Sequence, residues 1–197
     1  MKPTRHETYR WSRVGGHPAL DLCNTRSWRL EASRSTDRFA TPADLGDWYN
    51  SVLVSNQDRW TAATTTTALG QVRELRDALL EILDAHVTDA PAPASAWDTV
   101  AAAWRAAVTA ATPTRQLPWE WHLDPHTIDA PMHQLALHAA DLLSHPDLDR
   151  LRRCDGPGCG WLFLDQTRNR SRRWCDPADC GNRARVRAHT ERHRSPT

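Results

Sequence analysis

Four cysteines near the C-terminus constrain this chain more than any other feature of its sequence. They form two pairs, Cys154 with Cys159 and Cys175 with Cys180, with four residues inside each pair and fifteen between the pairs. Two close pairs joined by a short polar segment can surround one tetrahedral zinc ion. The spacing therefore predicts one structural Zn²⁺, with all four cysteines as ligands and no position open to a substrate.

Two other interpretations of these cysteines were weighed. Two disulfides or four unrelated thiols are disfavoured because nothing in the sequence indicates an oxidising compartment. A ligand set that uses His189 and His193 is disfavoured because only eight residues separate Cys180 from His189. A Cys2His2 finger usually has about twelve residues there. Four sulfur ligands remain the preferred set.

The distribution of apolar residues along the sequence indicates the cellular compartment of the protein. No apolar run approaches the roughly 18 residues that cross a bilayer, and no apolar segment follows the polar N-terminus, Met1 to Glu7. A signal peptide needs such a segment. We therefore expect a cytoplasmic protein that has no membrane partner, and we expect the isolated Cys23 to be a small buried residue.

Charge divides the 197-residue chain into two parts. Residues 150–197 carry twelve arginines against five acidic residues, a formal charge of +7, while residues 1–149 carry −6. An acidic body joined to a basic, cysteine-bearing tail suggests two modules with different partners. We expect a helical domain over residues 1–150 and a zinc module over residues 151–197.

The hydrophobic pattern of the body predicts a mainly α (α+β) fold with one short β element. Helices are expected to start at Thr41-Pro42 with a threonine cap, to cover 68–87, to run from a Ser95 cap to Val108, and to cover 131–145. Residues 119–123 alternate large apolar and polar side chains, which favours a strand. Residues 14–25 fit either a helix or a strand.

The zinc module is predicted to resemble a treble clef, a β-hairpin followed by a C-terminal helix. A tight loop at 154–159 precedes a strand at 160–165, and a second strand is expected at 172–174. Asp176 can cap the last helix and Pro177 can occupy its first position. Cys180 then lies in the opening turn, where the helix dipole favours a thiolate.

Several motifs of the chain resemble a known family. The segments Cys159-Gly160-Trp161-Leu162-Phe163-Leu164-Asp165, Arg172-Arg173-Trp174-Cys175 and Cys180-Gly181-Asn182-Arg183 resemble the CGNR zinc finger. Gly15 to Thr25 and the helix start from Thr41 to Trp48 are similar to the ABATE domain that accompanies this finger in stress-induced transcription regulators. The resemblance covers nearly the whole chain and implies regulation of transcription, in a stress response, through DNA binding.

Arginines of the module are the candidates for contact with nucleic acid. Arg183, Arg187 and Arg194 fall along one stripe of the expected last helix, Arg185 and Arg192 lie on its opposite side, and Val186 with Ala184 or Ala188 is expected to pack. The alternative is that arginines balance the −2 charge of a zinc ion with four thiolates. The candidate nucleic-acid residues are Arg172, Arg173, Asn182, Arg183, Arg187 and Arg194.

The body is a candidate sensor of a small-molecule effector. The chain has ten tryptophans, most of them expected in the core and a few expected to line an apolar cleft. The candidate ligand-pocket residues are Asp21, Asn24, Thr25 and Trp48. The alternative for the first three is that they hydrogen-bond to a neighbouring turn.

An enzyme is the second functional hypothesis. A biosynthetic enzyme could use a pocket of the N-terminal domain while the zinc is purely structural. Histidines at 17, 122, 126, 133, 138 and 145 could supply a base, with Asp21 or Glu120 as the acid partner. No nucleophile motif or phosphate loop is present, so no catalytic residue is assigned. A homodimer that carries an exposed arginine ridge would favour DNA binding.

Overall fold

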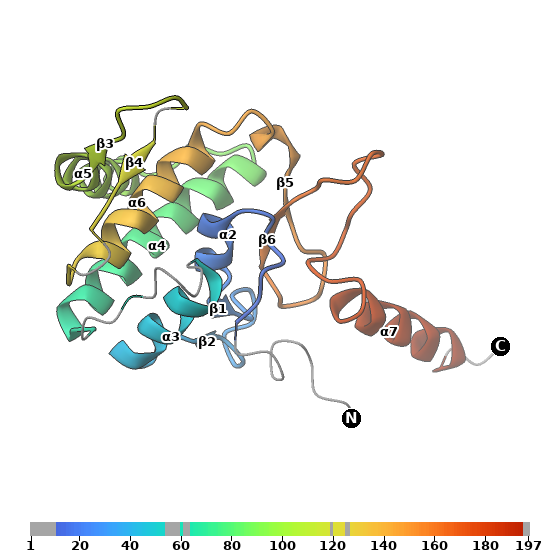
Figure 1. The fold of residues 1–197 in the computed structure, drawn as a ribbon. Helices are drawn as coiled ribbons and strands as arrows, with labels where there is room; N and C mark the ends of the chain where they lie inside the picture. Colours follow the sequence, from blue (N-terminus) through green and yellow to red (C-terminus); the bar gives the residue numbers. More distant parts are fainter. Residues whose placement is uncertain (1–10, 54–59, 61–63, 119, 125–126, 195–197) are drawn as a thin grey trace. The chain divides into compact units, whose positions relative to one another are not determined.

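The computed structural model describes residues 11–53, 60, 64–118, 120–124 and 127–194 (Figure 1). Its contacts divide the chain into two compact units. Unit 1 comprises Met1–Arg38 and Asp149–Thr197, and unit 2 comprises Phe39–Leu148. Within the described ranges, none of the helices has both the length and the apolar composition that crossing a bilayer requires.

Unit 2 is a helical domain with one small β element. Helices α4, α5 and α6 pack against one another, and α3 packs on α4 (Figure 1). Strands β3 (Thr112–Pro113) and β4 (Trp121–His122) pair antiparallel. The helices are α3 (Pro42–Val52), α4 (Thr66–Val87), α5 (Ala94–Ala110) and α6 (Ala130–Leu143).

The helix starts of unit 2 follow local capping rules. Before α3, the backbone N–H and hydroxyl of Thr41 both donate to the Asp44 carboxylate, at 2.7 and 2.8 Å, which satisfies groups that a helix start leaves unpaired. The expected Ser95 cap is wrong. Helix α5 begins at Ala94 after an extended Pro93, and the Pro93 carbonyl accepts from the Ala96 N–H. Ser95 is therefore the second residue of the helix.

The core of unit 2 comes from the periodic apolar residues of α4, as the sequence predicts. Leu75, Leu79 and Leu83 are fully buried, and Trp48 of α3 is fully buried as well. The Phe39 ring meets Trp48 edge to face, with ring centroids 5.7 Å apart. The strand expected at 119–123 is shorter in the structure, where β4 covers Trp121–His122; Trp119 lies outside the described residues.

Unit 1 joins both ends of the chain around the four cysteines. Residues 14–25, which fit either a helix or a strand, contain helix α2 (Pro18–Cys23). A short hairpin follows, with β1 (Arg26–Ser27) antiparallel to β2 (Thr36–Asp37). The C-terminal part has a 3₁₀ turn (Leu148–Arg150), β5 (Leu151–Arg153), β6 (Leu162–Leu164) and α7 (Cys180–Arg194).

The hairpin of the zinc module is present and the strand expected at 160–165 is confirmed as β6, but its partner strand differs from the prediction. Strand β6 pairs antiparallel with β5, which precedes the first cysteine pair, and Leu151 lies opposite Leu164. Residues 172–174 form no strand. The carboxylate of Asp165 explains this, because it accepts from the backbone N–H groups of Thr167 and Arg172, both at 2.9 Å. These bonds close the loop that follows β6 in place of a second ladder.

The compact units follow contacts rather than chain order, since residues 11–38 fold together with residues 149–194. Several hydrogen bonds join these two segments. The Leu164 N–H donates to the Gly15 carbonyl at 2.9 Å, and the Trp161 indole N–H donates to the Arg26 carbonyl at 3.0 Å. The division into 1–150 and 151–197 stays a prediction about which segments fold alone.

Candidate metal centre and arginine surface

The four sulfur atoms of the module form one compact cluster. All four Sγ atoms lie within 4.8 Å of one another, and all four cysteines are buried. The Sγ of Cys175 lies 3.8 Å from that of Cys159 and 3.5 Å from that of Cys180. Tetrahedral zinc with bonds of about 2.3 Å separates its sulfurs by about 3.8 Å, whereas a disulfide needs about 2.05 Å. None of these four cysteines forms a disulfide, and their sulfurs have the separation of metal ligands.

Each pair of cysteines is held by backbone that the flanking elements supply. Cys154 follows β5 and Cys159 lies two residues before Trp161, whose carbonyl accepts from the Cys154 N–H at 2.8 Å. The Cys175 N–H donates to the Cys154 Sγ at 3.2 Å, which joins the two pairs. Cys180 is the first residue of α7, so the helix begins three residues after Pro177, the expected first position. Asp176 caps the preceding turn instead, by accepting from the Ala178 N–H at 2.8 Å.

Glycines allow the closest approach to the cluster. The Gly156 N–H donates to the Cys154 Sγ at 3.4 Å. A Cβ at Gly156 would lie 2.9 Å from the Cys180 Sγ. Gly158 has φ +74°, and a Cβ there would meet the Glu31 side chain, because the Leu30 N–H donates to the Gly158 carbonyl at 3.2 Å. The first loop is therefore shaped both by its sulfurs and by the N-terminal segment that covers it.

The proton chemistry of the cluster calls for a cation. The hydrogen bond with Cys159 is the main cause that lowers the pKa of Cys154. The hydrogen bond with Cys154 is the main cause that raises the pKa of Cys159 and of Cys175. One thiolate is thus stabilised by its neighbours' thiols, while further thiolates repel it in a buried site. A divalent metal removes that repulsion, so this donor set fits zinc with four thiolates.

The rival histidine ligands lie outside the cluster. The rings of His189 and His193 contact each other edge to face on α7, with centroids 4.3 Å apart, and both residues are exposed. Within the described part of the chain, the cluster contains cysteines alone.

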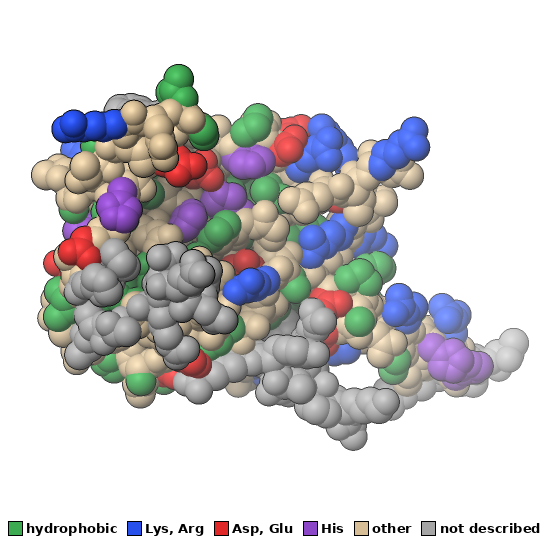
Figure 2. Space-filling model, in the orientation of Figure 1, with side chains coloured by type: hydrophobic (Ala, Val, Ile, Leu, Met, Phe, Trp, Pro, Cys, Tyr) green, Lys and Arg blue, Asp and Glu red, His purple; other side chains and the backbone are tan. Residues whose placement is uncertain are grey.

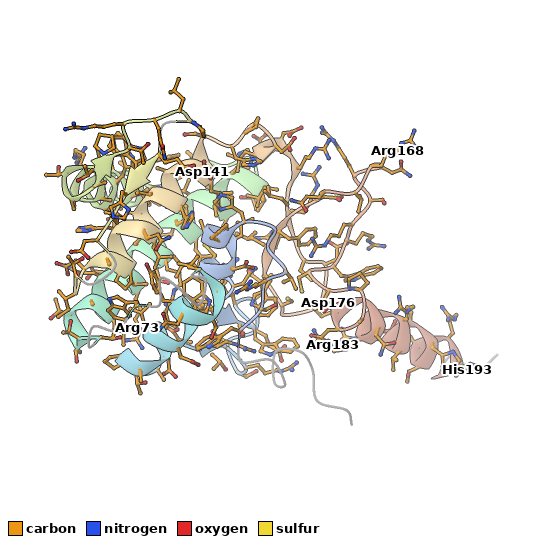
Figure 3. The ribbon with its side chains drawn as sticks, in the orientation of Figure 1. Arg73, Asp141, Arg168, Asp176, Arg183 and His193 are labelled. Carbon is orange, nitrogen blue, oxygen red and sulfur yellow. The ribbon has the colours of Figure 1, made fainter. Side chains whose placement is uncertain are left out.

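Arg183 is a partner of the metal centre. Its Nη2 donates to the Cys180 Sγ at 2.8 Å, and its Nε lies 3.6 Å from a carboxylate oxygen of Asp179. The guanidinium carbon also lies 4.4 Å from the centroid of the Trp28 ring. Figure 3 shows Arg183 beside the first turn of α7. A charge-assisted bond to a thiolate stabilises the anionic sulfur, so this arginine works inside unit 1.

Arg172 also has its guanidinium occupied by partners within unit 1. Its guanidinium donates to the carbonyls of Trp174 at 3.1 Å and Val14 at 2.8 Å, and a further bond goes to the Cys175 carbonyl. The guanidinium carbon lies 4.2 Å from the centroid of the Phe163 ring. Arg172 therefore ties the second cysteine pair to the N-terminal segment of unit 1.

The other candidate nucleic-acid residues are exposed. Arg173 pairs with Asp155 at 2.8 Å while two thirds of its side chain stays exposed. Asn182 and Arg187 are exposed on α7. Arg194 ends that helix, and its side chain lies outside the described residues.

The packing expected for α7 is wrong in one residue. Val186 is 58% exposed, whereas Ala184 and Ala188 are half-buried. These two alanines are four residues apart and share one face. Arg185 and Arg192, which were not among the candidate site residues, are both exposed. The alanine spacing alone could have indicated this orientation.

Asn24 binds the backbone of β6. Its side-chain amide donates to the Leu162 carbonyl, and its side-chain carbonyl accepts from the Leu162 N–H, both at 2.9 Å. Asn24 thus replaces a strand partner for β6, across 138 positions of sequence.

The three remaining pocket candidates are buried, and two of them form hydrogen bonds with nearby backbone groups. The Thr25 hydroxyl donates to the Leu22 carbonyl at 2.7 Å, and Trp48 is a core residue. Asp21 is buried and accepts from the Gly15 N–H at 2.9 Å. Burial raises the pKa of Asp21 to about 7, against the opposing effects of the Gly15 N–H and of nearby Arg13 and Arg172.

Unit 2 contains a cavity that none of these four candidates lines. The cavity has a volume of about 1380 Å³. Trp97, Trp104 and Trp121 line it and are 48%, 43% and 42% exposed. The sequence prediction of a tryptophan-lined cleft named other residues, because spacing alone does not distinguish a core tryptophan from one at a cavity.

Four of the six candidate histidines lie at capping or cavity positions, and His133 is half-buried on α6. His17 caps α2 by accepting from the Ala19 N–H at 3.2 Å, and His145 accepts from the Asp147 N–H at 3.1 Å. His122 and His138 line the cavity. His126 lies outside the described residues.

Comparison with known families supports both parts of the resemblance. Residues 16–146 match the ABATE family model, whose description is "putative stress-induced transcription regulator". Residues 150–193 match the CGNR zinc finger. No protein with a curated function matches the chain.

Proposed function

Because the chain belongs to the ABATE family of stress-induced transcription regulators and carries a CGNR zinc finger, we propose that it is a zinc-dependent regulator that binds DNA. Its four cysteines hold one structural Zn²⁺, which carries no open position for a substrate. Unit 1 supplies the nucleic-acid contact, and unit 2 senses a small molecule.

The exposed cationic surface of α7 carries the proposal for DNA binding. We define this surface by Arg185 and Arg192 on one side of the helix and by Arg187 on the opposite side. All three are exposed, and neither Arg187 nor Arg192 forms an ion pair within the described residues. Figure 2 shows arginines gathered over the loop after β6 and over α7. A helix of this kind fits the major groove or follows a phosphate backbone.

The metal centre supports the same role because it fixes the start of α7. Cys180 is both a sulfur of the cluster and the first residue of the helix. Unlike Arg187 and Arg192, Arg172 and Arg183 are occupied by carbonyl and sulfur acceptors. Arg185 donates to the Pro177 carbonyl at 3.3 Å, but its side chain stays exposed. We therefore assign positioning roles to Arg172 and Arg183 and phosphate contact to the cationic surface.

The test is the salt dependence of binding to a pool of mixed-sequence duplex DNA. Replacement of Arg185, Arg187 and Arg192 by alanine should lower the slope of log affinity against log salt by about 2.7, since each lost phosphate contact contributes about 0.9. Fluorescence anisotropy between 50 and 200 mM salt measures the slope. Removal of zinc by a chelator should abolish binding as well.

A matched control uses exposed arginines elsewhere. Arg105 and Arg115 are exposed in unit 2, and their double replacement by alanine should leave the slope unchanged. A triple variant of α7 that keeps the wild-type slope would contradict the assignment of the surface. Absence of duplex binding at the lowest salt concentration would contradict DNA binding itself.

The cavity of unit 2 supports the proposed sensing role. Ligand sites are usually concave and mostly apolar, with a few polar groups that fix orientation. The cavity combines tryptophan side chains with two histidines and two acidic residues. The homodimer suggested for a DNA-binding regulator stays a prediction, which sedimentation of the zinc-loaded chain would test.

A further inference from the structure

Three tryptophans at the cavity of unit 2 are exposed, although large aromatic side chains are usually buried in a folded protein. Trp48 and Trp60 are buried in the same unit, whereas Trp97, Trp104 and Trp121 stay 42–48% exposed. A cluster of exposed apolar side chains around a hollow is typical of an interaction site. Two of these tryptophans come from α5 and the third from β4, so the elements of the fold bring them together.

The charged groups of the same cavity have one sign. Glu120 and Asp141 are lining residues and both are exposed, and no lining residue in the described part of the chain is Lys or Arg. His122 and His138 add polar groups. Figure 2 shows histidine and acidic side chains on this face of unit 2, and Figure 3 places Asp141 on α6.

The exposed tryptophans and the two carboxylates together favour a positively charged ligand. The face of an indole ring attracts cations within about 6 Å of its centroid, and tryptophan is the most effective aromatic residue in this respect. Carboxylates attract cations as well, through their negative charge. An anion would be repelled by the two carboxylates, and none of the lining residues that the structure describes is a Lys or Arg that would offset this repulsion.

We propose that the cavity binds an organic cation with a large apolar or aromatic body. The tryptophan faces contact the apolar body and attract the charge, and Glu120 and Asp141 lie at the cationic end. The volume of about 1380 Å³ exceeds the roughly 300–1,000 Å³ of ordinary ligand sites, which suits a bulky ligand. This inference rests on the proposed sensing role of unit 2 and specifies its ligand class.

The probe for this inference is tetraphenylphosphonium, a bulky monocation, compared with neutral triphenylphosphine oxide. Isothermal titration calorimetry on the full-length zinc-loaded chain should show that the cation binds about tenfold more tightly than the neutral compound, since each of the two carboxylates contributes about threefold. Equal affinities, or absence of cation binding up to millimolar concentration, would overturn the proposal.

Variants locate the binding within the cavity. Glu120→Gln with Asp141→Asn should weaken cation binding about tenfold and leave binding of the neutral compound unchanged. Trp104→Leu should weaken binding of both. Asp98→Asn is the matched control, because Asp98 is exposed on α5 and does not line the cavity. Cation affinity that survives both sets of cavity substitutions, while circular dichroism shows an unchanged helical fold, would place the binding elsewhere and overturn the inference.

A second measurement separates this inference from the proposed function. Salt-dependent DNA affinity is recorded with and without saturating tetraphenylphosphonium. Cation binding that changes the DNA affinity supports both the cavity assignment and the sensing role. Cation binding that leaves DNA affinity unchanged retains the cavity assignment and contradicts sensing.

Discussion

In unit 1, individual polar side chains form hydrogen bonds with backbone groups that strand or helix partners would otherwise satisfy. Asn24 pairs with both backbone groups of Leu162, Arg172 collects backbone carbonyls, and Arg183 bonds a cysteine sulfur. The sequence identified all three as candidates for function because polar residues stood in apolar or cysteine-rich surroundings. That pattern is the same for a ligand-binding residue and for one that satisfies buried backbone, so the residue type alone could not separate the two roles.

Asn24 gives the prediction at this scale. Asn24→Ala should lower the free energy of unfolding by about 2–4 kcal/mol, because the Leu162 N–H and carbonyl lose their partners in a buried site. Urea denaturation of the zinc-loaded chain measures the change. Asn169→Ala, at an exposed position of the loop after β6, should change stability by less than about 0.5 kcal/mol. If Asn24→Ala lowered the free energy of unfolding by less than about 0.5 kcal/mol, water would be replacing the hydrogen bonds of the Asn24 side chain to Leu162.

At the level of elements, the helices of unit 2 and strand β6 of unit 1 were predictable, whereas the partner of β6 was not. Apolar periodicity and caps indicate α3 and α4 because both signals are local. The partner of β6 depends on where the Asp165 carboxylate closes a loop and on which side chains reach the cysteines. Local pattern contains neither fact, so residues 172–174 were wrongly assigned to a strand.

Two glycines give the prediction at this scale. Gly156→Ala should weaken zinc affinity by about tenfold or more, because its Cβ would approach the Cys180 Sγ to 2.9 Å and displace a ligand. Competition with a chelating dye measures the affinity. Gly70→Ala provides the control in α4, where a Cβ meets nothing within 4 Å.

The control substitution should raise stability by about 0.5–1 kcal/mol, since alanine is the better helix former, and should leave zinc affinity unchanged. Wild-type zinc affinity in Gly156→Ala would mean that the first loop shifts to accept the methyl group without moving a sulfur.

At the level of the whole molecule, the metal centre is covered by residues from the opposite end of the chain. The Arg29 N–H donates to the Cys159 carbonyl and the Leu30 N–H donates to the Gly158 carbonyl, both at 3.2 Å. Zinc in small modules decides whether the module folds. The N-terminal segment of unit 1 should therefore depend on zinc although it contains none of the four clustered cysteines.

Hydrogen exchange after chelation tests this dependence. The amides of Arg29 and Leu30 should lose protection together with that of Leu164, whereas the amides of α4 in unit 2 should keep theirs. Addition of zinc should restore the protection. Protected amides at Arg29 and Leu30 in the chelated chain would show that the N-terminal segment folds independently of the metal.

The sequence by itself determined the four-cysteine cluster, the helical body and the family, because cysteine spacing, apolar period and short motifs are local quantities. Only the tertiary structure decided which polar residues satisfy backbone, which arginines remain exposed on α7, and which tryptophans line a cavity. Each of these depends on contacts between residues far apart in the chain. The physical reason is burial: the same Asn, Arg or Trp is structural when the fold encloses it and is available for binding when the fold leaves it exposed.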